Sequence, residues 1–176
     1  MREILSNNTN AIIGIIGTLL GVILGAVINQ IYRYGSLKLY PKNFRMAFLK
    51  RSESGHYSEQ NKIDSDTESV TIYFDLDLYN SSSEQKIGRE TLLVLLKDGK
   101  EKKEVIKDLS TRRPTSYSFK TDQLESFNIP PKTLENLKLE AYFKKEDLSW
   151  MEGSIFLFEY KDHKNKIKRK KLNTLS

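Results

Sequence analysis

The sequence predicts one N-terminal transmembrane α-helix followed by an all-β domain, an antiparallel β-sandwich. Three features carry this prediction: an uncharged apolar block at residues 11–28, a strictly alternating segment at residues 70–79, and short strand-like runs separated by turn residues. An apolar helix of about twenty residues spans the roughly 30 Å hydrocarbon core of a bilayer. We therefore divide the chain into a short flank (1–10), the helix (11–32) and the β-sandwich domain (33–176).

The apolar block carries no ionisable side chain, and its one hydroxyl belongs to Thr18. An isolated span must satisfy its backbone polar groups internally, which favours a helix. The alternative is a cleaved signal peptide, which has a basic start, a shorter apolar region and a small-residue cleavage site. Here Arg2 and Glu3 cancel, and the apolar run is long. We expect a retained membrane anchor.

Basic residues are distributed unequally around the helix. Arg2 precedes it, whereas six basic residues follow it closely: Arg33, Lys38, Lys42, Arg45, Lys50 and Arg51. An excess of lysine and arginine in short flanks marks the cytoplasmic side. We expect a single-pass protein of the cell membrane, with its N-terminus outside and its C-terminal domain in the cytoplasm.

Three glycines, Gly17, Gly21 and Gly25, repeat at a spacing of four inside the apolar block. This spacing places them on one helix face, where a second helix can approach closely. The motif indicates self-association as a homodimer, or packing on a partner helix. The alternative is that glycine is simply common in membrane helices.

The β-domain is predicted from alternation and turns. The residues that share the apolar face of segment 70–79 are Val70, Ile72, Phe74, Leu76 and Leu78. The run 92–97 precedes Asp98-Gly99, a strong hairpin signal, and should pair with residues 100–106. Further strands are expected at 36–40, 45–49, 116–120, 137–143 and 154–160. Short strands separated by turns at this spacing are typical of a sandwich.

Two segments are expected outside the strands. Residues 51–68 contain few apolar side chains and many Ser, Glu, Asp and Asn, so we expect a mobile loop there. A single helical turn is expected near residues 132–136.

Several of these elements resemble small immunoglobulin-like β-sandwiches. The resemblance rests on a strand that ends in Leu78-Tyr79-Asn80-Ser81, a following apolar strand, and the run 129–133 (Ile-Pro-Pro-Lys-Thr) before an alternating strand. Such modules occur behind a single N-terminal helix in bacterial membrane proteins of unknown function. The resemblance covers residues 37–172 and implies a fold. It transfers no functional residue, and the Cys–Trp–Cys signature of true immunoglobulin domains is absent.

The basic excess of the chain lies near its C-terminus. The net charge is +6, and the segment 161–171 alone contains seven basic residues and one acid, Asp162. We expect residues 161–172 to return as a hairpin strand, in which lysines protect a sheet edge from aggregation. The same cluster is a candidate contact for anionic lipid, formed by Lys164, Lys166, Lys168, Arg169, Lys170 and Lys171. A nucleic-acid partner is not expected, because aromatic residues do not alternate with these lysine and arginine residues.

No catalytic, cofactor or metal site is predicted. The chain has no cysteine, and its two histidines, His56 and His163, are far apart in sequence. Asp75 and Asp77 share a strand face, but alternation already places them on the solvated side of a sheet.

These observations favour a non-enzymatic, membrane-anchored β-sandwich that binds the lipid bilayer and a protein partner at the cytoplasmic face of a bacterial membrane. Two alternatives remain open. One is a membrane effector that oligomerises through its glycine-rich helix. The other is an exported envelope or adhesion domain, which requires the reversed topology.

Overall fold

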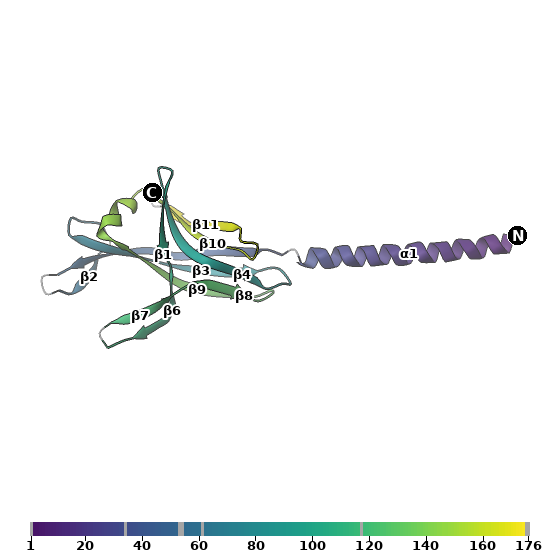
Figure 1. The fold of residues 1–176 in the computed structure, drawn as a ribbon, viewed down its shortest axis with the longest axis horizontal. Helices are drawn as coiled ribbons and strands as arrows, with labels where there is room; N and C mark the ends of the chain where they lie inside the picture. Colours follow the sequence, from purple (N-terminus) through teal and green to yellow (C-terminus); the bar gives the residue numbers. More distant parts are fainter. Residues whose placement is uncertain (1, 34, 53–54, 61, 117, 175–176) are drawn as a thin grey trace.

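The computed structural model describes residues 2–33, 35–52, 55–60, 62–116 and 118–174, which form a long helix and a β-sandwich (Figure 1). Helix α1 (Arg2–Arg33) extends away from one end of the sandwich. It begins within the expected flank and contains the apolar stretch Ala11–Ile31, whose mean hydropathy is 2.7. No residue of this stretch is buried. The stretch is long and apolar enough to cross a membrane, and a signal sequence would meet the same criterion.

The sandwich consists of two antiparallel sheets. In spatial order, the six-stranded sheet contains β2 (Tyr57–Gln60), β1 (Leu37–Arg51), β3 (Thr67–Asn80), β9 (Leu134–Lys144), β6 (Lys107–Pro114) and β7 (Phe119–Gln123). The second sheet contains β11 (Ile167–Thr174), β10 (Ile155–Lys161), β4 (Lys86–Lys97) and β5 (Lys100–Val105), with β8 (Ser126–Ile129) paired to the first part of β4. Strand β11 therefore forms one edge of its sheet.

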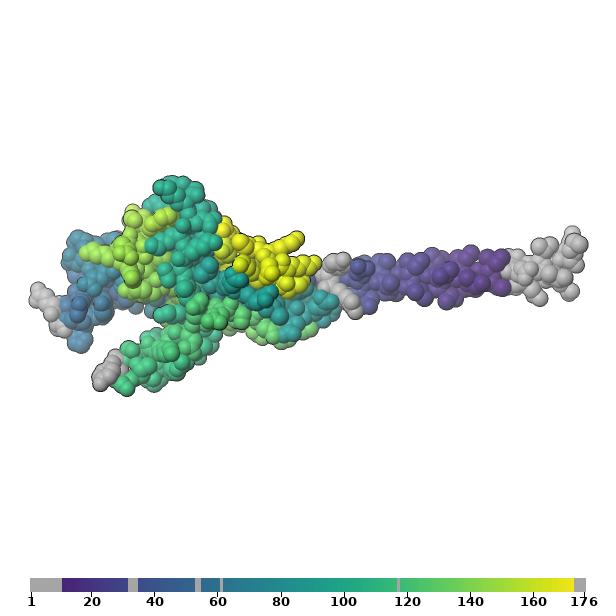
Figure 2. Space-filling view, viewed as in Figure 1, coloured from purple at the N-terminus to yellow at the C-terminus, as the bar shows by residue number. Residues whose placement is uncertain are grey.

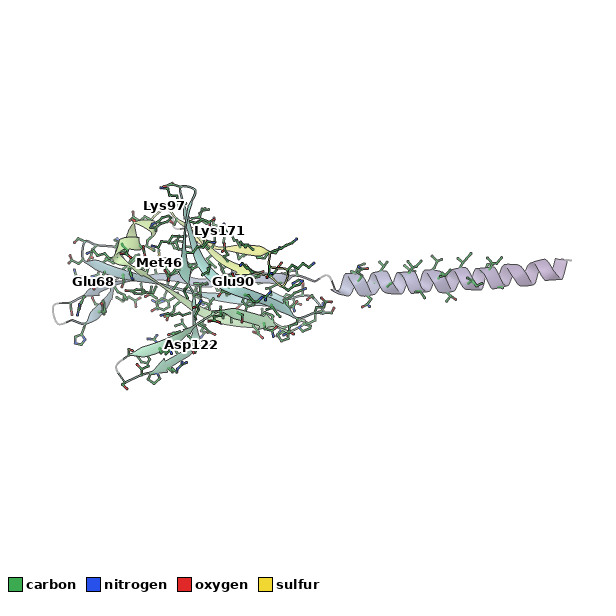
Figure 3. The ribbon with its side chains drawn as sticks, in the orientation of Figure 1. Met46, Glu68, Glu90, Lys97, Asp122 and Lys171 are labelled. Atoms are coloured by element: carbon green, nitrogen blue, oxygen red, sulfur yellow. The ribbon has the colours of Figure 1, made fainter. Side chains whose placement is uncertain are left out.

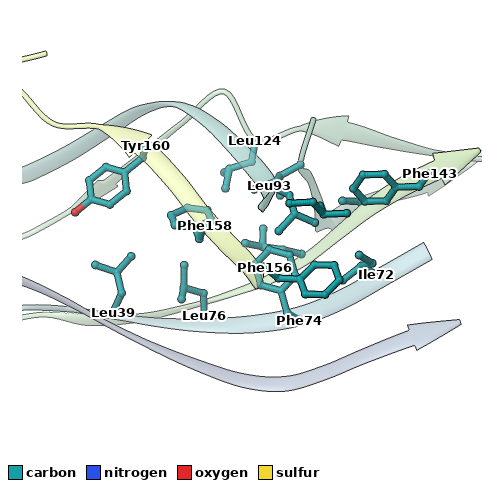
Figure 4. Packing of buried hydrophobic residues seen from close by; sticks show 14 of the residues in the cluster. Leu39, Ile72, Phe74, Leu76, Leu93, Leu124, Phe143, Phe156, Phe158 and Tyr160 are labelled. Carbon is teal, nitrogen blue, oxygen red and sulfur yellow. The ribbon is translucent and has the colours of Figure 1, made fainter. Parts of the chain in front are cut away.

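The core lies between the sheets and follows the predicted alternation. The five apolar residues of β3, from Val70 to Leu78, are each at most 1% exposed. Large side chains from β10 complete the layer, among them Phe156 and Phe158 (Figure 4). Ile106 connects β5 to β6 across the two sheets and is itself fully buried. The alternation thus identifies which face of β3 is buried.

The Asp98-Gly99 hairpin forms as predicted. Lys97 pairs with Lys100, and Asp98 and Gly99 have φ angles of 49° and 74°. Positive φ at both central residues is the geometry that a two-residue hairpin turn requires, and it explains the residue types found there.

The segment 51–68 differs from the expected loop. Strand β1 continues to Arg51, and β2 pairs antiparallel with it from Phe48↔Gln60 to Arg51↔Tyr57. Polar composition misled the prediction because β2 extends the sheet beyond the core, where three of its four residues are exposed and need no apolar face.

Residues 37–51 form one strand and not the two expected ones. The register with β3 shifts between Lys42 and Arg45, and Asn43 adopts a φ of 51°. The Nδ2 atom of Asn43 donates a hydrogen bond to Asp75 Oδ2 at 2.7 Å. This bulge re-aims the chain without ending the strand.

Two further differences concern polar segments. The expected helical turn at 132–136 is absent, since Leu134 already begins β9, whereas a 3₁₀ helix, η1 (Lys145–Trp150), follows that strand. Strands β6 and β7 form a hairpin that projects from the sandwich (Figures 1 and 2). Arg113 and Asp122 join its strands through two hydrogen bonds, at 2.6 and 3.0 Å; Asp122 is labelled in Figure 3. Strand β7 overlaps the end of the strand expected at 116–120, whereas β6 was not expected, because most of its residues are exposed and carry no apolar pattern.

Candidate functional site

The connection between helix and sandwich is docked on the domain. Ser36 N–H donates to Ser81 Oγ at 3.0 Å, and Ser36 carbonyl oxygen accepts from the backbone N–H and the hydroxyl of Ser81 at 3.1 and 3.0 Å. Gly35 lies against the same loop, so closely that a Cβ there would lie 2.2 Å from the Cα of Ser82. The first strand therefore starts from a fixed position beside the helix end.

A buried asparagine organises the loop that receives this connection. Asn80 is fully buried at the end of β3. Its Nδ2 atom lies within hydrogen-bond distance of the carbonyl oxygens of Glu84, Ile129 and Pro130, at 2.7 to 3.0 Å. Its Oδ1 accepts from the backbone and hydroxyl of Ser82. One side chain thereby joins three chain segments at the helix end of the sandwich, where sequence composition alone indicated only a turn.

The β10–β11 hairpin turns at the same end of the sandwich. Asp162 Oδ1 accepts hydrogen bonds from the backbone N–H groups of Lys164 and Lys166, at 2.8 and 3.0 Å. Burial raises the pKa of Asp162, but these two hydrogen bonds outweigh it, so its pKa lies below the ordinary value. The carboxylate therefore stays ionised and holds the turn from which β11 departs.

A groove runs along the side of the sandwich between β1 and β11. Three cavities, of about 540, 280 and 370 Å³, form it. The first and second share Gly35, Lys86 and His163 in their walls, and the second and third share Leu37, Tyr160 and Lys168. The groove therefore extends from the end of α1 along the first part of β1.

Only four of the six predicted basic residues line this groove. Lys168 and Lys170 line its far part, and Lys164 lines the cavity beside the helix. Lys166 and Lys171 are exposed on the hairpin and strand; Lys171 is labelled in Figure 3. Arg169 also lines the groove, but its guanidinium is engaged by two carboxylates. The cluster is thus divided between groove, surface and an ion-pair network.

The network of Arg169 lies across the second sheet. Arg169 Nε donates to Glu159 Oε2 at 2.6 Å, and its two terminal nitrogens donate to Glu101 at 2.6 and 2.9 Å. Lys103 Nζ lies 2.8 Å from the other oxygen of Glu159. The hydrogen bonds from Arg169 hold the pKa of Glu101 below its usual value. The side chain of Glu159 is 6% exposed. Burial raises the pKa of Glu159, but the hydrogen bonds from Lys103 and Arg169 lower it by more, so the pKa lies below the ordinary glutamate value.

Two groove cations were not singled out by sequence. Lys38 comes from β1 and Lys86 from the start of β4, 123 and 75 residues before the basic segment begins at Lys161. Strand β4 lies in the same sheet as β11, with β10 between them, and β1 contacts β11 from the other sheet, so both lysines reach the groove. Lys38 was counted only as part of the basic flank, and no local pattern indicates this juxtaposition.

The glycine face of α1 is open. A Cβ added at Gly17, Gly21 or Gly25 would meet nothing within 4 Å. The three positions lie on one face because they are separated by four residues each. The face is available for a second helix.

Groups for metal binding are not assembled in the described part of the chain. Within it, no three His, Cys, Asp or Glu side chains are close enough to hold a metal ion. His56 is exposed in the connection between β1 and β2, whereas His163 lies in the β10–β11 turn at the helix end. Asp77, on β3, is engaged by Lys42 and by Asn136 Nδ2 at 2.8 Å.

Two packed antiparallel sheets with these connections define an immunoglobulin-like β-sandwich, preceded by an apolar helix. The chain belongs to the YopI Ig-like domain family, whose model matches residues 35–173. The match begins at the docked Gly35 and ends within β11. The expected class of fold is thereby confirmed.

Two solved structures are similar to this chain at low sequence identity. An uncharacterised β-sandwich protein from Clostridium difficile 630 has 10% identity and a TM-score of 0.36, with 78% of this chain and 85% of that one covered. A Northeast Structural Genomics Consortium target has 12% identity and a TM-score of 0.34, with coverages of 80% and 84%. No curated protein matched the chain.

Proposed function

We propose that this protein is a non-enzymatic, membrane-anchored interaction module, in which α1 crosses the membrane and holds the sandwich at the cytoplasmic face. The observation that carries the proposal is the docked connection. The apolar stretch ends at Ile31, and β1 begins at Leu37. Six steps along the chain reach at most about 20 Å. Gly35 and Ser36 are furthermore bound to the β3–β4 loop. The domain would therefore rest at the headgroup layer.

Exposure of the helix supports the anchor. The large apolar side chains of the stretch are 47–66% exposed, from Val27 to Val22 and Ile31. In water such a continuous surface would be unfavourable, at about 25 cal/mol per Å² of apolar area. A bilayer removes it from water, while the helix satisfies its own backbone groups.

Orientation follows from charge. Basic residues follow the helix, including Lys38 and Lys42 on the first strand, and lysine- or arginine-rich flanks remain in the cytoplasm. The reversed topology would instead make the chain an exported envelope or adhesion domain.

For a protein partner, the candidate surface is the β6–β7 hairpin, which projects from the sandwich (Figure 1). Phe119 is 62% exposed on it, with Arg112 4.5 Å from the centre of its ring. A projecting strand pair with an aromatic residue and an arginine has the composition favoured at protein interfaces. The open glycine face supports pairing of two copies through α1, which is also the arrangement that a membrane effector would use.

Topology is the test of this function. The chain has no cysteine, so Asn8→Cys and Lys100→Cys, at the Asp98-Gly99 turn, give single labelling sites. A membrane-impermeant maleimide on intact cells should label position 8 and not position 100, and both should react after permeabilisation. Labelling of position 100 alone would replace the cytoplasmic module by the exported domain. Release of the chain from membranes by alkaline carbonate would overturn the anchor itself.

A further inference from the structure

The groove between β1 and β11 combines an apolar floor with a basic rim. Leu37, Leu39 and Tyr160 supply apolar surface to its far part, and Tyr160 is 7% exposed. Burial raises the pKa of Tyr160, so its ring stays uncharged. The same part of the groove is also lined by Lys38 from β1 and by Lys168 and Lys170 from β11. Such a wall fits an amphiphile with a negatively charged head.

The lysines of the rim are largely uncompensated. Within the described residues, Lys38, Lys86 and Lys170 form no ion pair within 4 Å, in contrast to Arg169 on the same strand. The positive charge of Lys168 interacts with the carboxylate of Asp162. That carboxylate already accepts hydrogen bonds from the backbone of its own turn. Glu84 is the other acid on the walls. Cations therefore outnumber acids along the groove, which favours an anionic ligand.

The position of the groove identifies the source of that anion. Its largest cavity is lined by Ala26, Asn29 and Gln30 of α1 as well as by Lys86 and Lys164 of the sandwich. A ligand there would touch the end of the apolar helix and the basic wall together. A phospholipid in the leaflet that meets the sandwich would have its acyl chains beside α1 and its phosphate at this level.

We propose that the groove binds the headgroup of one anionic phospholipid. Lys86 and Lys168 contact the phosphate near the helix, while Lys38 and Lys170 extend the positive surface farther along the sandwich. This inference rests on the proposed anchor and deepens it, because it assigns the anchored face a ligand. It also adds Lys38 and Lys86, which the basic C-terminal segment does not contain.

The test uses the full-length chain in a neutral detergent, titrated with phosphatidylglycerol or phosphatidylcholine and observed by native mass spectrometry. We expect one phosphatidylglycerol to be retained with at least about tenfold higher affinity than phosphatidylcholine. Equal retention of the two lipids would overturn the proposal, whatever the variants do.

A charge-matched pair of variants locates the site. Lys38→Gln, Lys168→Gln and Lys170→Gln together remove three groove charges, whereas Lys100→Gln, Lys138→Gln and Lys144→Gln remove three exposed charges elsewhere. The groove variant should lose at least about tenfold in affinity for phosphatidylglycerol, and the control should stay within about twofold. Equal losses in both would reduce the effect to overall charge and overturn the site. Thermal unfolding followed by Trp150 fluorescence verifies that both fold.

Two soluble competitors show whether the groove binds a lipid headgroup, a free phosphate or an acidic peptide. Soluble glycerol phosphate and a poly-glutamate peptide should not displace the lipid, because neither can use the helix-side cavity. Displacement by glycerol phosphate would identify a free-phosphate site, and displacement by the peptide would identify a protein-binding groove; either overturns the lipid assignment. Binding in detergent does not require insertion in a cell membrane. Failure here together with carbonate-resistant membrane association would therefore reject the headgroup site and leave the anchor standing.

Discussion

Gly35 and Ser82 are in backbone contact: a Cβ on Gly35 would lie 2.2 Å from the Cα of Ser82. No flexible side chain is involved, so neither partner can rotate away. The helix and the sandwich are therefore joined by a connection that is part of the folded domain. This relationship holds Gly35, four residues after the end of the candidate span at Ile31, on the domain in the wall of the basic groove.

Replacing Gly35 by alanine should therefore disturb the junction. The added methyl group forces the backbone of Gly35 or Ser82 to move, and overpacking of this kind costs about 1–3 kcal/mol. We expect a lower unfolding temperature of the full chain in detergent, followed through Trp150. Gly14→Ala is the control, since a Cβ there meets nothing within 4 Å. An unfolding temperature unchanged by Gly35→Ala would show that the connection is not docked.

Gly88 has a comparable relationship with Phe127 inside the sandwich. A Cβ on Gly88 would lie 2.1 Å from the ring, which is itself 5% exposed and packs against Tyr160 with ring centroids 5.3 Å apart. We expect Gly88→Ala to lower the free energy of unfolding by about 1–3 kcal/mol.

A double-mutant cycle isolates this contact. Phe127→Leu shortens the opposing side chain, so the cost of Gly88→Ala should be smaller in its presence, by about 0.5 kcal/mol or more. Denaturant unfolding of the four chains measures the coupling. Additive costs would mean that the ring of Phe127 is not the obstacle.

The sequence predicted those parts of the fold whose signal is local. Alternation from Val70 to Leu78 identified β3, and Asp98-Gly99 identified the β4–β5 turn. Strands β2 and β6 were not predicted, because their mostly exposed residues carry no apolar period, and β7 overlaps only the end of the strand expected at 116–120. The close approach of Gly35 to Ser82 depends on tertiary packing, and so does the convergence of Lys38, Lys86 and Lys168. Neither is encoded in the spacing of residues along the chain.

The ion pairs of Glu159 predict a dependence of stability on acid pH. Its pKa is lower in the folded protein than the ordinary glutamate value, because hydrogen bonds from Lys103 and Arg169 outweigh the effect of burial. A carboxyl with a depressed folded-state pKa stabilises the fold above its unfolded pKa, and this contribution is lost as the pH falls through the folded value. We expect the free energy of unfolding to decline on acidification below the ordinary glutamate range.

Glu159→Gln tests the assignment of that effect. It should cost about 1.5–3 kcal/mol at neutral pH, the range for hydrogen bonds to charged groups. It should also flatten the acid limb of the curve measured by denaturant unfolding at several pH values. Glu146→Gln is the control, because Glu146 is exposed in η1. An acid limb equally steep in Glu159→Gln and in the native chain would assign the effect to other carboxyls.

Association of two chains through α1 is predicted to depend on Gly21. Leucine at this position would cover the centre of the face formed by Gly17, Gly21 and Gly25, and a second helix could no longer approach closely. Energy transfer between donor- and acceptor-labelled Lys100→Cys chains in liposomes should therefore fall several-fold in Gly21→Leu. Ile23→Leu is the matched control, because two residues correspond to a rotation of about 200° and place it on the opposite side of the helix. If both variants transfer energy equally well, contact between the helices does not use the glycine face, and the membrane-effector alternative loses the feature that supports it.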